Sequence, residues 1–257
     1  MQMLCTALWL QFCVFSSSET MHQAEVVQAI KDKDFRRFSV ACVQLENVDF
    51  VAGISFEKDF FIEEYGSGSF DLESWTPLMV LCAGARICEK DELCRERMVS
   101  LLLGCGADPN YSDSAGQYCL GQSILLHRPI VARMLLRAGA RPRQSGIGID
   151  HTIMLAVQSQ PDLVPDLAKH GARVNAMQGN MNYGDWAMCV GAYDGLRALV
   201  RAGFDLSRLD ASDGTGFASM VRTPKDPAKV SEWRRTVRWI RKRLSKDGES
   251  VKGTGKQ

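Results

Sequence analysis

The chain has 257 residues, of which 46% are hydrophobic and 24% are charged, as in an ordinary globular protein. Its 31 Lys and Arg residues nearly balance 30 Asp and Glu residues, which leaves a net charge of +1. This balance excludes a generally basic nucleic-acid wrapper and a generally acidic disordered chain, and 22 glycines with 8 prolines are too few for a collagen-like or low-complexity protein.

Residues 1–20 are expected to be a leader. The first 15 residues are mostly apolar, and Ser16, Ser17 and Ser18 follow them. This run is too short to cross a membrane. It is similar to the apolar region of a signal peptide, but no Lys or Arg precedes it. We therefore expect a cytoplasmic protein, with secretion as the alternative if residues 1–18 act as a signal peptide.

The nine cysteines are odd in number and loosely spaced, and most lie in apolar runs. This pattern favours buried free thiols in a reducing compartment over a disulfide framework. Cys82, Cys88 and Cys94 recur every six residues, but they lack the paired spacing of a zinc site. No metal is expected.

The segment 21–45 is predicted to be an N-terminal capping repeat, because Val26, Val27, Ile30 and Phe35 recur at helical spacing. The following residues, 46–74, form a long inter-repeat loop in this interpretation. A loop of that length within a compact domain is unusual and often functional, but the sequence assigns it no role.

The middle of the chain repeats with a period near 33 residues. Each copy is an apolar helical segment that runs into a glycine, and the glycines are 33, 32 and 32 residues apart. A leucine precedes every glycine by four residues, which predicts a helix that packs on its neighbours and ends in a left-handed residue. The glycines are Gly106, Gly139, Gly171 and Gly203, and the leucines are Leu102, Leu135, Leu167 and Leu199.

With the single intact Thr76-Pro77-Leu78 motif, this pattern resembles the ankyrin repeat family. The resemblance implies an all-α, ankyrin-like helical repeat solenoid, with degenerate repeats over residues 75–221. Thr76 can cap a helix and Pro77 suits a first helical turn. The interval from Leu78 to Gly106 is nine residues longer than the interval from Leu120 to Gly139, so an insertion is expected between the two helices of that repeat, as a helix extension.

Residues 222–246 are predicted to be a basic C-terminal capping helix, followed by a disordered tail at 247–257. Trp233, Val237, Ile240 and Leu244 form its apolar stripe. We favour a solvated capping face, and keep binding of an acidic ligand, either nucleic acid or acidic membrane, as the less favoured alternative. The cations are Arg234, Arg235, Arg238, Arg241, Lys242 and Arg243.

No short catalytic signature accompanies the four histidines, and His127 and His170 are interpreted as structural residues near helix ends. We therefore expect no enzyme, no cofactor and no small-molecule substrate.

The resemblance implies instead a protein-interaction module, acting as an adaptor, scaffold or inhibitor and present as a monomer. A secreted or host-targeted effector that uses the same surface is the alternative. Candidate contacts lie in the loops between repeats, since Tyr, Trp, Met and Arg are enriched at interfaces. Tyr183 and Met181 are predicted to be surface residues, whereas Trp186 suits a core or an interface equally. The candidates are Tyr111, Arg141, Arg143, Met181, Asn182, Tyr183 and Trp186.

Overall fold

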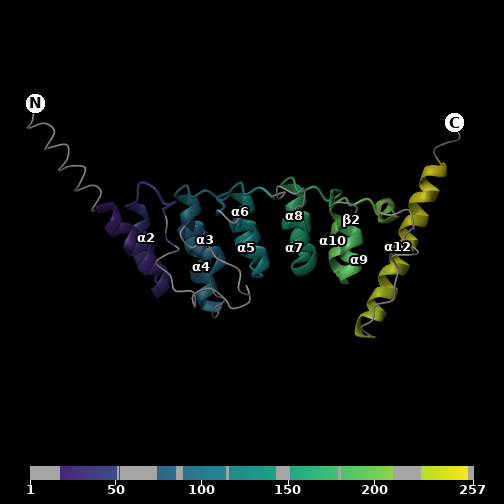
Figure 1. Cartoon of the computed structure of the whole chain (residues 1–257), viewed down its shortest axis with the longest axis horizontal. Coiled ribbons are helices and arrows are strands. Elements are labelled where there is room, and N and C mark those ends of the chain that lie inside the picture. The colour runs from purple at the N-terminus through teal and green to yellow at the C-terminus, as the bar shows by residue number, and fades with distance from the viewer. Residues whose placement is uncertain are drawn as a thin grey trace, which may run out of the picture. The chain divides into compact units, whose positions relative to one another are not determined.

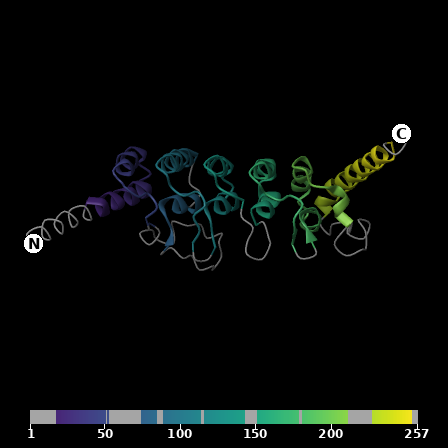
Figure 2. The ribbon, with the colours of Figure 1, turned by 90° about the horizontal axis from the view of Figure 1, so that it is seen from above.

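The computed structural model of the chain divides into two compact units, Met1–Ala140 and Arg141–Gln257. Within each unit, helices stack in antiparallel pairs, so the described part of the chain has an all-α repeat fold, as the sequence predicts (Figures 1 and 2). The structure describes residues 18–50, 52, 74–84, 89–113, 116–142, 151–178, 181–210 and 227–253. Most of the expected leader and of the 46–74 loop lies outside these ranges.

The first unit begins with a helix over residues 18–32, followed by α2 (Phe35–Val43). Asp34 starts α2, because its carboxylate accepts hydrogen bonds from the backbone amides of Arg36 and Arg37 at 2.9 and 3.1 Å. Phe38, which is fully buried, anchors this helix in the core.

Two further helix pairs complete the first unit. They are α3 (Pro77–Ala83) with α4 (Glu89–Gly104), and α5 (Cys119–Leu125) with α6 (Pro129–Arg137). Thr76 caps α3 through a 3.4 Å bond from the Met79 amide to its hydroxyl, which confirms the role expected for that motif. At 16 residues α4 is much longer than α6, with nine, so the expected helix extension is confirmed.

The second unit contains α7 (His151–Ser159), a short 3-10 turn η5 (Pro161–Leu163) and α8 (Val164–Lys169). A small hairpin of β1 (Met177–Gln178) and β2 (Met181–Asn182) leads into α9 (Tyr183–Val190), which pairs with α10 (Tyr193–Arg201). The 3-10 turn η6 (Leu206–Asp210) and the long helix α12 (Pro227–Gly253) close the unit. The last helix extends seven residues into the segment expected to be a disordered tail.

Four helices end in the same way, at the glycines of the sequence period. Gly106, Gly139, Gly171 and Gly203 have φ between 93° and 97°, a left-handed conformation that suits glycine. The residue after each glycine donates its amide to the carbonyl of the repeated leucine, as Ala140 does to Leu135 at 2.9 Å. This bond satisfies a carbonyl at the helix end and turns the chain into the next loop.

The core of each unit is built on the repeated leucines. Leu102, Leu135, Leu167 and Leu199 all have 0% exposed surface, which confirms the buried column that the sequence predicts. First helices contact first helices and second helices contact second helices within each unit, as α3 does with α5 and α4 with α6.

Candidate functional site

In the second unit, the loop between α8 and α9 is fixed by hydrogen bonds to the loop of the next repeat. The Asn175 amide donates to the Gly203 carbonyl at 3.0 Å and accepts from the Asp205 backbone amide at 2.9 Å. The Arg208 guanidinium donates to the Asn175 carbonyl at 2.9 Å. These bonds fix the loop at Asn175, and a segment that is already fixed loses less entropy on binding.

The hairpin that follows carries two methionines on opposite faces. Its register pairs Met177 with Asn182 and Gln178 with Met181. Cross-strand partners share a face and successive residues alternate, so Met177 lies on the Asn182 face and Met181 on the other. Both methionines are 37% exposed, which leaves apolar surface in solvent on each side of the hairpin.

An open hollow lies beside this hairpin. It is defined by Ala172, Arg173, Val174, Asn175, Ala176, Met177 and Arg208, and we name it the loop hollow. Arg173 and Arg208 are exposed and place two guanidinium groups at its surface. The nearby Asp205 carboxylate accepts two hydrogen bonds from Ser207, which lower its pKa, and the positive charge of Arg208 lowers it further. The hollow therefore combines an apolar methionine with fixed positive charge.

For two of the predicted binding residues, the expected position on the surface is wrong. Tyr183 is only 2% exposed and Asn182 only 1%. Asn182 caps α9, because its side-chain oxygen accepts from the Asp185 amide at 2.8 Å and its nitrogen donates to the Arg208 carbonyl at 2.6 Å. Tyr183 is the first residue of that helix and turns inward with it.

The other predicted loop residues are placed differently. Met181 and Arg141 are exposed, and Trp186 is half-buried. Tyr111 is partly buried, and its hydroxyl donates to the Ser74 carbonyl, so it holds the start of α3. Arg143 lies outside the described residues. None of the described residues in the predicted set lines the loop hollow, although Asn182 donates to the carbonyl of Arg208, which does. Sequence reasoning missed Arg173 and Arg208.

The basic helix α12 docks on the second unit through one face. Thr236 and Ile240 have no exposed surface and Val237 has 6%, where the helix meets α10 and η6. The Arg197 guanidinium of α10 donates to the Thr236 hydroxyl at 2.9 Å. This docking supports the capping role expected for the helix. Among the described residues, no helix is both long and apolar enough to cross a membrane, α12 included.

All six predicted cations of α12 are exposed. The Arg243 guanidinium lies over the ring of Trp239, 5.6 Å from its centre. Glu232 is the single acidic residue between Lys229 and Arg243. The docked helix therefore presents concentrated positive charge to solvent, a second candidate surface.

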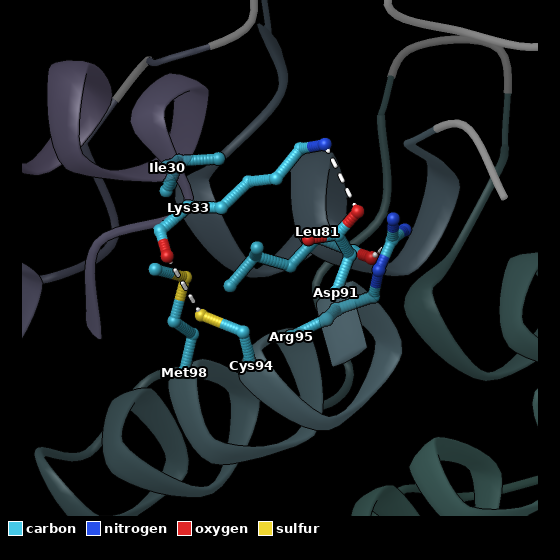
Figure 3. Close-up of a pocket in the computed structure, with 7 residues that line it drawn as sticks. All are labelled: Ile30, Lys33, Leu81, Asp91, Cys94, Arg95 and Met98. Atoms are coloured by element: carbon cyan, nitrogen blue, oxygen red, sulfur yellow. Dashed lines mark hydrogen bonds and ion pairs between the residues drawn. The ribbon is translucent and has the colours of Figure 1, made fainter. Parts of the chain in front are cut away.

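In the first unit, a small pocket lies between the helix over 18–32, α3 and α4 (Figure 3). The Lys33 ammonium lies 3.1 Å from the Asp91 carboxylate, and the Cys94 thiol donates to the Lys33 carbonyl at 3.1 Å. The pocket volume of about 20 Å³ has room for about one water molecule. It is therefore too small to accept a metabolite.

Three of the described thiols have a raised pKa, which favours their protonated form. Burial raises the pKa of Cys42 to about 12 and also raises the pKa of Cys94. A hydrogen bond with Cys82, together with burial, raises the pKa of Cys119. Protonated thiols are poor nucleophiles and poor metal ligands. No cluster of three or more His, Cys, Asp or Glu residues suited to a metal occurs in the described ranges.

Two buried arginines form a network that the sequence does not signal. The Arg95 guanidinium donates to the carbonyls of Leu81 and Gly84 at 3.1 and 2.8 Å, and Arg128 donates to those of Cys82 and Gly84. Glu92 lies 3.6 Å from each guanidinium. The arginines satisfy carbonyls at the end of α3 and join two repeats, so the network is structural.

Comparison with known proteins finds a match over part of the chain. The family model of the ankyrin repeat matches residues 73–114, which cover α3, α4 and the loop that follows. No curated protein matches the chain. Ankyrin repeats generally serve as non-enzymatic modules for binding other proteins.

Proposed function

Since the chain carries an ankyrin repeat within an all-α repeat fold, we propose that it is an adaptor or scaffold that binds a protein partner through the loop hollow of its second unit. The observation that carries this proposal is the juxtaposition of Arg173 and Arg208 with the exposed Met177 on a loop fixed by Asn175.

The chemistry of the hollow indicates which partner segment fits. A methionine offers a deformable apolar contact. A guanidinium binds a carboxylate through two parallel hydrogen bonds. The complementary segment therefore carries an apolar side chain close to an Asp or Glu residue.

The loop hollow is suited to binding for an energetic reason as well. The bonds from Asn175 and Arg208 fix the backbone before the partner arrives. Binding then requires little further ordering, so more of the contact energy appears as affinity.

The test is affinity capture from a lysate of the source cells at moderate salt, with the full chain as bait. The Arg173→Ala, Met177→Ala double variant should recover the partner at least about tenfold less than wild type, since such a change corresponds to about 1.4 kcal/mol. Captured proteins are identified by mass spectrometry.

A matched control is Arg201→Ala with Val190→Ala. This pair also removes one exposed arginine and one apolar residue, and Val190 is 39% exposed, against 37% for Met177. Its recovery should equal that of wild type. Equal recovery by both double variants would place the partner elsewhere on the chain and refute the proposed surface.

A further inference from the structure

The exposed side of α12 has a regular arrangement of charge. An α-helix turns about 100° per residue, so residues seven apart lie almost in line. Arg234 and Arg241 form one such row, and Arg235 and Lys242 form a second row about 100° around the helix. Arg238 lies between the rows, on the side opposite the docked residues Thr236, Val237 and Ile240. We name these five cations the cationic face.

The docking of α12 restricts what can bind this face. A helix that binds a membrane interface inserts its apolar side into the lipid. Here the apolar side is covered by α10 and η6, and Ile240 has no exposed surface. A lipid surface would therefore gain charge interactions alone, worth about 1 kcal/mol per cation.

Duplex DNA matches the cationic face better in charge density and in shape. From Arg234 to Lys242 the helix rises about 12 Å. The same length of duplex carries about seven phosphates. The major groove is about 12 Å wide and accepts an α-helix, with phosphate backbones along both walls. Two rows of cations that flank a central Arg238 correspond to those two walls.

The types of side chain support the same ligand. Four of the five cations are arginines, whose planar guanidinium groups donate paired hydrogen bonds to phosphate oxygens. The face holds no Asn or Gln for reading adenine, so contacts to the phosphates dominate.

We propose that the cationic face of α12 binds duplex DNA in the major groove, with little dependence on sequence. This site is separate from the loop hollow and does not depend on the protein partner proposed there. The buried side of α12 packs on the repeats of the second unit, and the opposite side is left for the DNA.

The test is fluorescence anisotropy of the full chain with a labelled 20-base-pair DNA duplex over a series of salt concentrations. Four phosphate contacts, made by the two rows of cations, predict a slope of log K against log salt of about −3.6. The Arg234→Gln, Arg238→Gln, Arg241→Gln variant should have a shallower slope of about −2. It should bind at least about 100-fold more weakly at 0.1 M salt.

A matched control removes the same charge elsewhere in the unit, at the exposed residues Lys169, Arg201 and Lys229, each changed to Gln. It should bind within about threefold of wild type, because contact between cation and phosphate, not net charge, dominates. A second variant, Arg234→Lys with Arg238→Lys and Arg241→Lys, should keep most of the wild-type affinity, because it keeps the charge. Circular dichroism establishes that each variant is folded.

Three results would overturn the proposal. The first is a wild-type chain that does not bind the duplex at low salt. The second is an equal loss of DNA affinity in the cationic-face variant and in its control. The third is equal or tighter binding to an RNA duplex of the same sequence or to phosphatidylserine vesicles. The major groove of duplex RNA is too narrow for a helix, so DNA should be preferred.

Discussion

The close approach of α10 to α7 at Gly195 provides a sharp test of packing in the second unit. Gly195 is buried within α10. A Cβ atom there would lie 2.1 Å from the Val157 carbonyl oxygen and 2.7 Å from Val157 Cγ1. The oxygen belongs to the backbone of α7, so a rotamer change cannot relieve the contact, and the two helices must move apart by about 1 Å to restore ordinary contact distances.

We predict that Gly195→Ala lowers the free energy of unfolding by about 2 kcal/mol. Alanine favours a helix over glycine by about 1 kcal/mol, which acts in the stabilising direction. Overpacking a close-packed core costs about 1–3 kcal/mol and more where the backbone must shift. The contact with a main-chain oxygen puts the cost at or above the upper end of that range, so the clash outweighs the gain in helix propensity.

The assay is urea unfolding followed by circular dichroism, with Gly104→Ala as the control. Gly104 is the last residue of α4, and a Cβ there would meet no atom within 4 Å. The control should therefore be as stable as wild type, or up to about 1 kcal/mol more stable. A Gly195→Ala variant with wild-type or higher stability would refute the packing of α7 against α10.

Three further predictions follow from burial and protonation. Leu135→Ala should cost about 2–5 kcal/mol as a core truncation, and a urea-unfolding loss below about 1 kcal/mol would contradict its burial. Tyr183→Ala should cost about 3–5 kcal/mol, whereas the exposed Met181→Ala should change stability by less than about 0.5 kcal/mol, so equal effects in thermal unfolding would reverse that assignment. The pKa of Cys42, raised to about 12, makes the folded state hold a proton that the unfolded state releases near pH 9. The free energy of unfolding should therefore fall between about pH 9 and 11. The fall should be steeper in wild type than in Cys42→Ala by about 1.4 kcal/mol per pH unit, and parallel pH profiles of the two proteins would contradict this.

The repeated second helix could be predicted from the sequence because its residues obey local rules. A left-handed glycine and a buried leucine four residues before it are both set by the geometry of one helix end. The observed φ values of 93–97° at all four glycines and the complete burial of all four leucines follow from those rules. The roles of Thr76 and Pro77 at the start of α3 could be predicted for the same reason, because a capping side chain acts within its own turn.

The burial of Tyr183 could not be predicted in this way. Its neighbours Met181 and Asn182 read as part of a polar loop, and tyrosine is common at interfaces. Whether it faces solvent depends on where α9 begins. Asn182 supplies the cap in the place where the T-P-L motif has eroded, so the helix starts at Tyr183 and carries the ring into the core.

Arg128 shows a similar limit, because arginine is rarely buried. Its position follows from carbonyls at the end of α3, more than 40 residues earlier in the chain. A hydrogen bond between residues so far apart in the sequence depends on how two repeats stack, and no local sequence pattern predicts it. The same holds for the loop hollow, whose Arg173 and Arg208 come from different loops.

Net charge over the whole chain also concealed a feature that matters for binding. Residues 1–140 hold 12 Lys and Arg against 18 Asp and Glu, whereas residues 141–257 hold 19 against 12. The two units therefore carry net charges of −6 and +7, which nearly cancel. An average near zero excludes a chain that is basic throughout, but long-range attraction falls off over about 10 Å at 0.1 M salt, so a ligand responds to the charge of the unit it approaches. The loop hollow and the cationic face both lie on the positive unit, which favours acidic ligands for each.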